Sequence, residues 1–255
     1  MATANVIRRT DIYNDPAFNY AHYWQGRDYE HRAEVLALRR LLRGRRFGHA
    51  VDVGGGYGRL SVILSDYADR VTLVDPSAQQ LELSRQILPA SATVERELMD
   101  AANLRFEDGS IDLATMIRVL HHLPEPTAEL AELSRILRPG GYAVVEAANS
   151  AHAANRIGHL ARGKRIPESV LDIRSEESRQ RGAAPFVNHH PRAISRQLQA
   201  AGLQVQRVLS VSNLRHPVVK SVLPEWFMLS LERAAQRPLA RLHFGPSIFF
   251  LLRKR

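Results

Sequence analysis

Residues 51–58 read Val-Asp-Val-Gly-Gly-Gly-Tyr-Gly and are the most informative stretch of this 255-residue chain. A short apolar run followed at once by glycines is typical of a buried strand that turns sharply towards a helix. Glycine suits such a turn because it bends tightly and leaves no Cβ in the way of a ligand. A helix expected from about Arg59 would offer unpaired backbone N–H groups to that ligand. The stretch therefore predicts a site for a nucleotide-like ligand.

The spacing of the glycines excludes two common nucleotide sites. A dinucleotide fingerprint needs glycines at its first, third and sixth positions. Counting from Gly54, the third position is Gly56, but the sixth is Arg59. No Lys-Ser or Lys-Thr pair follows the loop, so a phosphate-binding P-loop is excluded as well.

The chain resembles the class I S-adenosylmethionine (SAM)-dependent methyltransferases, most closely their type 11 group. The family pattern acid-x-Gly-x-Gly-x-Gly is matched by Asp52-Val53-Gly54-Gly55-Gly56-Tyr57-Gly58. Four further motifs of the family follow in order, at Val71–Ser77, Asp100–Phe106, Ile111–Leu123 and Leu137–Tyr142. Together the five motifs cover residues 49–148, and their order makes the resemblance specific.

The resemblance implies a cofactor, a fold and a set of contacts. The cofactor is SAM, with S-adenosylhomocysteine as its product. The fold is a doubly wound α/β sheet of seven mostly parallel strands, with the last strand antiparallel between the fifth and the sixth. The implied cofactor-binding residues are Asp52, Gly54, Gly55, Gly56, Tyr57, Gly58, Asp75, Pro76, Asp100, Ala101 and Arg118.

Three acidic residues of this set have roles that can be stated chemically. Asp75 lies 17 residues after Gly58, at a strand end where its carboxylate can accept hydrogen bonds from both ribose hydroxyls. Its alternative role is to start an Asp-Pro turn. By resemblance, Asp100 and the backbone of Ala101 contact adenine, and the alternative is a helix N-cap for residues 101–105. Asp52 can serve the cationic amino-acid end of the cofactor, directly or through water, or tie down the glycine loop, and the two roles do not exclude each other.

The hydrophobic pattern predicts alternating strands and helices, which favour a parallel doubly wound sheet. Helices are expected over residues 29–43, 58–67, 77–88, 126–137 and 191–201. Strands are expected over 49–53, 70–74, 92–96, 111–117, 141–147 and 203–211, with a last strand from Ser247.

Three segments outside the motifs are candidates for an acceptor site. We divide the chain into an N-terminal helical cap (1–48) and a SAM-binding domain (49–255), with substrate-side insertions at 149–190 and 213–240. The aromatic segment 11–30, with Tyr23, Trp24 and Arg27, is expected either to close over the cofactor as a lid or to pack the first helix onto the sheet. The first insertion contains His189 and His190. The second is expected to be an amphipathic helix that covers the pocket, forms a dimer face, touches a membrane or simply packs.

His121 and His122 follow the predicted fourth strand, where reacting groups of this fold converge. A histidine there can remove a proton from the acceptor near neutral pH. Alternatively, one of the two caps backbone groups before Pro124 and the other packs inward. No metal site is expected, because the neighbouring His189 and His190 point apart on an extended backbone.

Composition and charge limit the remaining possibilities. The chain has no cysteine, which excludes disulfides and thiolate chemistry, and it shows neither a secretory signal nor a membrane-spanning stretch of about 20 apolar residues. We expect a soluble, cytoplasmic protein, monomeric or homodimeric. Residues 149–255 have 18 basic and 6 acidic side chains, which would suit nucleic acid, an anionic membrane or an acidic small molecule. Arginine used as the default surface cation explains the same count, and no basic run is interleaved with aromatics.

The sequence therefore predicts a SAM-dependent methyltransferase that acts on oxygen, nitrogen or carbon of a small molecule, either a metabolite or a lipid-like compound. One alternative is an RNA methyltransferase that uses the basic C-terminal part. The other is a non-catalytic scaffold that keeps the SAM-binding fold.

Overall fold

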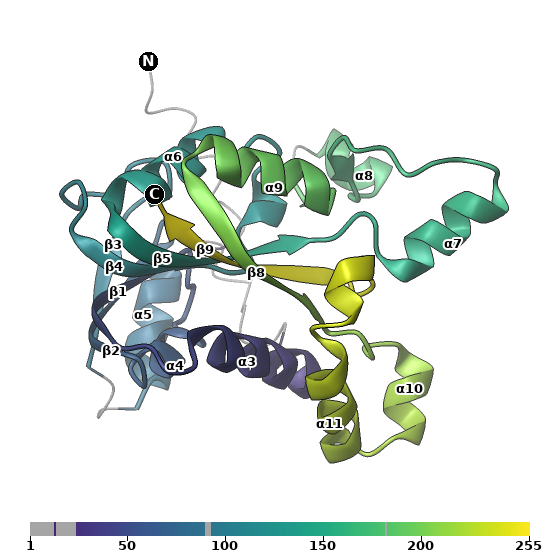
Figure 1. Ribbon diagram of the computed structural model, residues 1–255, viewed down its shortest axis with the longest axis horizontal. Helices are drawn as coiled ribbons and strands as arrows, with labels where there is room; N and C mark the ends of the chain where they lie inside the picture. The colour runs from purple at the N-terminus through teal and green to yellow at the C-terminus, as the bar shows by residue number, and fades with distance from the viewer. Residues whose placement is uncertain (1–12, 14–23, 90–92, 182) are drawn as a thin grey trace.

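The computed structural model describes residue 13 and residues 24–89, 93–181 and 183–255, and at its centre lies one seven-stranded sheet (Figure 1). The strand order is β3-β2-β1-β4-β5-β9-β8. Neighbouring strands from β3 to β5 are parallel, whereas β9 is antiparallel to both β5 and β8. The expected insertion of the last strand between the fifth and the sixth is therefore confirmed. The strands are β1 (Phe47–Val53), β2 (Ala68–Asp75), β3 (Val94–Leu98), β4 (Ile111–Met116), β5 (Leu137–Ala148), β8 (Leu203–Val211) and β9 (Ser247–Lys254).

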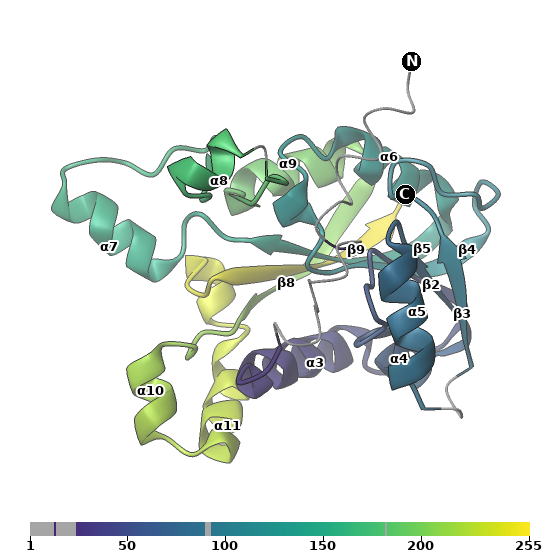
Figure 2. The same cartoon turned by 180° about the vertical axis from the view of Figure 1, so that it is seen from behind.

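Helices cover both faces of the sheet, and each face has its own apolar core. Figures 1 and 2 show α6 and α9 on one side and α3, α4 and α11 on the other. Successive strand residues point to opposite faces, so Ala50 joins the core beneath α3 while Val51 joins the core beneath α6. The helices of the sheet are α3 (Asp28–Leu42), α4 (Ser61–Leu64), α5 (Ala78–Ile87), α6 (Thr127–Ile136), α9 (Pro191–Ala200) and α11 (Glu225–Ala235).

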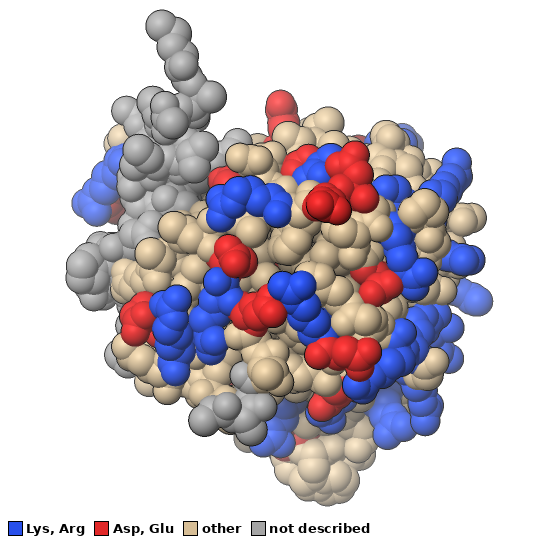
Figure 3. Space-filling model, turned by 90° about the vertical axis from the view of Figure 1, so that its left-hand side faces the viewer, with Lys and Arg blue, Asp and Glu red and all other residues tan. Residues whose placement is uncertain are grey.

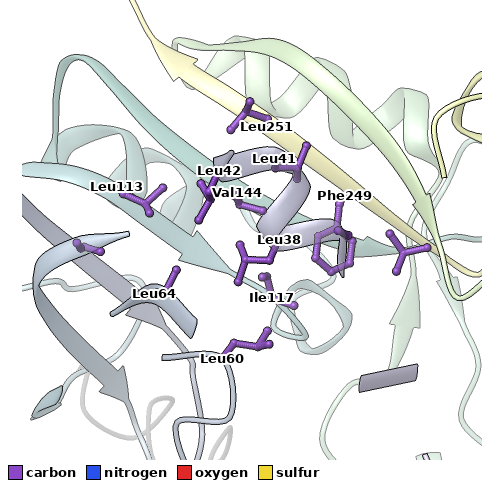
Figure 4. Packing of buried hydrophobic residues seen from close by; sticks show 14 of the residues in the cluster. Leu38, Leu41, Leu42, Leu60, Leu64, Leu113, Ile117, Val144, Phe249 and Leu251 are labelled. Atoms are coloured by element: carbon purple, nitrogen blue, oxygen red, sulfur yellow. The ribbon is translucent and has the colours of Figure 1, made fainter. Parts of the chain in front are cut away.

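The described part of the N-terminal segment is built into the main core. Figure 4 shows Leu38, Leu41 and Leu42 of α3 packed over Val144 and Phe249 of the sheet. All five side chains are fully buried. Complete burial of such a side chain contributes about 1.5–3 kcal/mol, so α3 is a structural helix of the domain.

Two helices differ from their predicted extents. The helix expected over 58–67 is reduced to the four residues of α4, because the chain still makes turns between Gly55 and Leu60. The single helix expected within 213–240 is divided into α10 (Pro217–Val222), α11 and a 3-10 turn, η3 (Leu239–Leu242). Pro224 explains the break, because the residue before a proline is pushed out of the helical region, and Leu223 is extended (φ −102°, ψ 136°).

The first insertion lies beyond the carboxyl end of β5. It contains α7 (Ala153–Ala161), α8 (Glu176–Gln180) and two short antiparallel strands, β6 (Leu171–Asp172) and β7 (Val187–Asn188). Backbone hydrogen bonds from His189 N to Ala148 O (2.7 Å) and from Ser150 N to His189 O (3.0 Å) attach its end to β5. Both α7 and α10 project from the same end of the molecule in Figures 1 and 2. Within the described ranges, no helix has the length and apolar character needed to cross a membrane.

Candidate cofactor and acceptor site

The glycine loop after β1 is folded back tightly against its neighbours. The N–H groups of Gly54 and Gly55 both donate to the carbonyl oxygen of Val74, at 2.7 and 3.2 Å. Gly54 has φ +67°, and a Cβ there would lie 2.5 Å from Cγ2 of Val119. A Cβ on Gly55 would lie 2.7 Å from Oδ2 of Asp52 and would overlap Leu73. The loop therefore needs glycine both for its conformation and for the space around it.

Asp75 ends β2 and points at the glycine loop. Its Oδ2 accepts the N–H of Gly56 at 2.8 Å, and its Oδ1 accepts the N–H of Ser77 at 2.8 Å. Only 7% of the residue is exposed, and burial raises the pKa of its carboxyl to about 6. The bond to Ser77 is the turn expected from an Asp-Pro sequence, so Asp75 both starts a turn and faces the loop.

A first cavity of about 110 Å³ lies beside this carboxylate. It brings together seven of the predicted cofactor-binding residues: Gly54, Gly56, Asp75, Pro76, Asp100, Ala101 and Arg118. Asp100 accepts the N–H of Ala102 at 2.8 Å within a turn, and the alternative helix over 101–105 does not form. These residues are far apart in sequence, and the carboxyl ends of β1, β2, β3 and β4 place them in one wall.

The sequence analysis did not identify Gln80, which also lines the first cavity. It belongs to α5 and is 1% exposed. Neither its Nε2 nor its Oε1 has a hydrogen-bond partner within the described ranges. A buried amide without partners is costly, and a ligand that offers both a donor and an acceptor would relieve that cost. The adenosine part of SAM offers both, so this wall fits the predicted cofactor.

Asp52 is fully engaged inside the protein. Ser61 Oγ donates to its Oδ2 at 2.7 Å, and Thr115 Oγ1 donates to its Oδ1 at 2.6 Å. Burial raises the pKa of the Asp52 carboxyl. These bonds tie β1 to β4 and α4, which favours the loop-tying role. Together with Gly55 and Tyr57, Asp52 also lines a small cavity of about 30 Å³, whereas Gly58 lines none of the cavities described here.

Arg59 also lines this small cavity and was missed as a site residue, because it counted only as a failure of the dinucleotide motif. Its guanidinium lies 3.7 Å from the ring centre of Trp24 and forms an ion pair with Glu34. It also donates to Nδ1 of His31 at 2.5 Å. Burial lowers the pKa of His31, which suits its role as a neutral acceptor. The arrangement holds a cation at the end of the glycine loop.

Arg118 lies where the cavities meet. It lines the first cavity, the small cavity and a second cavity of about 140 Å³. Its backbone has φ +65°, and its N–H donates to Oε2 of Glu146 at 3.0 Å. Left-handed backbone is uncommon for a residue other than glycine and is found where the surrounding structure imposes it, often at functional sites.

The two neighbouring histidines face different cavities. His122 lines the first cavity, and both of its ring nitrogens are engaged. Its Nδ1 donates to the carbonyl oxygen of Pro185 at 3.1 Å, so its Nε2 accepts the hydroxyl of Tyr13 at 2.7 Å. His121 lines the second cavity and stacks against His122 and Phe186, with ring centres 3.9 and 4.8 Å apart. Within the described ranges it makes no hydrogen bond, and burial lowers its pKa well below the ordinary value.

The second cavity is lined in part by residues of the predicted lid. Of the predicted lid residues, Trp24 and Arg27 line it, while Tyr23 lies outside the described residues. Glu34 and Arg215 also line it, and neither was predicted. These four residues lie just before α3, in α3 and in the loop after β8, so only the folded chain could reveal the set.

The other two predicted substrate residues have structural partners. Nε2 of His189 donates to the carbonyl oxygen of Leu120 at 2.9 Å, which ties the insertion to the loop after β4. Nδ1 of His190 accepts the N–H of Arg192 at 3.3 Å and caps α9. The side chains point apart, as expected. Within the described ranges, no group of three or more His, Cys, Asp or Glu side chains could hold a metal ion.

Parts of the chain are similar in sequence to known proteins. Residues 51–145 match the family model of a methyltransferase domain. The O-methyltransferase cnsE of Penicillium expansum is 33% identical over 176 residues, covering 64% of this chain and 63% of that protein. The ubiquinone biosynthesis O-methyltransferase of Xanthomonas oryzae pv. oryzae is 31% identical over 125 residues, covering 48% of this chain and 51% of that protein.

A solved structure extends the likeness to nearly the whole chain. A SAM-dependent methyltransferase from Thermotoga maritima, described as a possible histamine N-methyltransferase, aligns with a TM-score of 0.62 at 20% identity. The alignment covers 98% of this chain and 99% of that one, and it shows the fold. The chain spans 29% to 63% of the length of the first curated relatives that it matches.

Proposed function

We propose that this chain, in which residues 51–145 form a methyltransferase domain of the class I SAM-dependent family, transfers a methyl group to a hydroxyl of a small-molecule acceptor. The observation that carries the proposal is the position of Arg118, which lines both the cavity beside Asp75 and the cavity that contains His121. A donor on one side of Arg118 and an acceptor on the other would meet there.

The donor is held by groups of the first cavity. Asp75 would accept hydrogen bonds from the ribose hydroxyls, and Asp100, Ala101 and Gln80 would contact the adenine. Arg59 and Arg118 line the space next to the glycine loop, where they suit the carboxylate of the methionyl end. When bound, SAM supplies a methyl group that is already activated by its attachment to a sulfonium.

The residues of the second cavity orient the acceptor and receive its proton. His121 is suited to that role because its lowered pKa keeps the imidazole neutral near pH 7 and it has no hydrogen-bond partner in the described chain. This imidazole would accept the proton of the acceptor hydroxyl as the hydroxyl oxygen bonds the methyl carbon. The carbon–sulfur bond that breaks would leave its electron pair on the sulfur of S-adenosylhomocysteine. His122 cannot do the same, because both of its nitrogens are already engaged.

The acceptor is a small hydroxylated molecule. The cavity of about 140 Å³ is close to the roughly 150 Å³ of a cavity that holds one benzene ring. Two of the curated relatives are O-methyltransferases by name, which supports oxygen as the acceptor atom. Sequence identity over part of those proteins supports the reaction and leaves the individual substrate to experiment.

The test is a transfer assay with SAM that carries a labelled methyl group and a panel of hydroxylated single-ring compounds. We expect label in an organic-extractable product, and we expect the variant His121→Gln to lose transfer while it keeps S-adenosylhomocysteine binding. Label in RNA, with affinity that falls steeply as salt rises, would replace the small-molecule proposal by the RNA alternative. Cofactor binding without transfer to any compound would favour the scaffold alternative.

A further inference from the structure

A basic groove of about 410 Å³ lies outside the site described above, between α7, the start of α9 and the end of η3. Its charged lining consists of Arg156, Lys164, Arg165 and Arg192, and no acidic residue of the described ranges lines it. His159 and His190 also line it. The groove borders the proposed acceptor cavity, since Ala151 lines the groove and His152 lines that cavity.

The four cations of the groove differ in their carboxylate partners from the basic residues at the opposite end of the molecule. Figure 3 shows that end, where basic and acidic side chains lie next to one another over much of the surface. There Arg46 pairs with Asp69 at 2.7 Å and Arg70 pairs with Glu95 at 2.6 Å. Among the described residues, none of the four groove cations forms an ion pair with a carboxylate. The groove is therefore a concentrated positive surface that attracts anions.

Helix α7 presents its apolar stripe to solvent. Ala153, Ile157 and Leu160 are three or four residues apart and share one face. Ile157 is 69% exposed and Leu160 is 79% exposed, and no residue of α7 is buried. Arg156 and His159 occupy the neighbouring stripe, which lines the groove. A helix that exposes its apolar face next to unpaired cations has the pattern of an interfacial helix.

We infer that α7 and the basic groove dock this chain on a membrane surface that contains anionic phospholipids. The cations contact lipid phosphates, while Ile157 and Leu160 enter the boundary of the acyl layer. A second copy of the chain would bring like charges together across a symmetric contact, and a nucleic acid would leave the apolar stripe uncovered. The inference goes beyond methyl transfer, and its test needs neither cofactor nor acceptor.

The first test is flotation of the full chain with vesicles. We expect binding to phosphatidylcholine vesicles that contain about 30% phosphatidylglycerol, little binding to phosphatidylcholine alone, and weaker binding as salt is raised. The variant Arg156→Gln/Lys164→Gln/Arg165→Gln should lower the partition coefficient about a hundredfold, because each cation near an anionic surface contributes about a fivefold increase in binding. The variant Ile157→Ser/Leu160→Ser should lower it about tenfold.

A matched control separates the local surface from net charge. The variant Arg39→Gln/Arg46→Gln/Arg70→Gln removes three cations from the paired surface at the opposite end, and it should lower the partition coefficient much less than the groove variant. The substituted groove and stripe side chains are exposed, so circular dichroism should show unchanged folding.

Four results would overturn the inference. One is no binding to anionic vesicles, and another is equal loss in the groove and control variants. A third is competition by inorganic pyrophosphate together with full binding by the stripe variant, which would indicate a site for soluble anions. The fourth is a concentration-dependent dimer in sedimentation that the stripe variant abolishes, which would show that a second copy covers α7.

Discussion

In the proposed site, Asp75 should make cofactor affinity depend on pH, and the size of the effect follows from its pKa. Only the ionised carboxylate accepts hydrogen bonds from both ribose hydroxyls, and burial raises its pKa to about 6. At pH 8 the group is ionised, whereas at pH 5 only about a tenth of it is. We therefore expect the affinity for S-adenosylhomocysteine to fall about tenfold between pH 8 and pH 5, measured by isothermal titration calorimetry.

The variant Asp75→Asn isolates this effect. Its amide does not titrate and offers one acceptor oxygen, so it should bind the cofactor about 30- to 100-fold more weakly at pH 8, because hydrogen bonds to a charged acceptor contribute about 1.5–3 kcal/mol each. Its affinity should then change little between pH 8 and pH 5. An unchanged affinity at pH 8, or the same pH dependence in the variant, would refute the role of Asp75.

The stability of the cofactor-free chain should depend on pH in the opposite direction, falling as pH rises. The pKa of Asp75 in the folded chain is raised above the ordinary 3.8, so its stabilising contribution is complete below that value and is lost as pH rises through about 6. At pH 8 the buried charge lowers the free energy of unfolding by about 3 kcal/mol relative to a protonated Asp75, because the pKa is raised from 3.8 to about 6. Asp75→Asn removes that cost and loses part of the bonding to Gly56 and Ser77. The apo variant should therefore melt higher than the parent at pH 8, by about 2–4 °C per kcal/mol gained.

Three further substitutions test other parts of the site. Gly55→Ala should destabilise the chain by about 1–3 kcal/mol in urea unfolding and weaken cofactor binding, because its Cβ would overlap Leu73 and Asp52. His121→Gln should lower kcat about 100-fold or more without changing the dissociation constant of the cofactor. Glu34→Gln should cost about 3–5 kcal/mol of stability, because it leaves the guanidinium of Arg59 without its buried partner.

Each of these variants has a control within the same chain. Gly158→Ala lies in exposed α7 and has only one neighbour, at 3.4 Å, so its stability should not fall. His49→Gln lies outside the three cavities described here and should keep kcat. Glu82→Gln breaks an exposed ion pair, and its free energy of unfolding should stay within about 0.5 kcal/mol of that of the parent. If a variant and its control change the measured stability or kcat equally, the role proposed for the substituted residue is contradicted.

The sheet and the position of Asp75 and Asp100 at one cavity followed from the sequence because their signals are local. Apolar runs marked the strands, and the glycine loop and the acid at the end of β2 have a fixed spacing along the chain. Since the carboxyl ends of parallel strands meet at one edge, Asp75 and Asp100 reached the same cavity as expected. Pro224 was visible too, but its effect on the preceding residue was not used to divide the second insertion.

The set of residues around the second cavity could not be predicted because it depends on tertiary contacts. The stack of Trp24 on Arg59 and the pair of Arg59 with Glu34 join residues more than 20 positions apart, with no repeat or motif to link them. The unequal roles of His121 and His122 likewise depend on Tyr13 and Pro185. A His-His pair has no sequence feature that says which ring keeps a free nitrogen.

The most direct test of the proposed site is a crystal structure of the chain with bound S-adenosylhomocysteine. We expect the ribose on Asp75, the adenine beside Asp100 and Gln80, and the sulfur near Arg118, facing the cavity that contains His121. A ligand that leaves Asp75 and Gln80 without contact, or whose sulfur faces away from that cavity, would contradict the proposed geometry of methyl transfer.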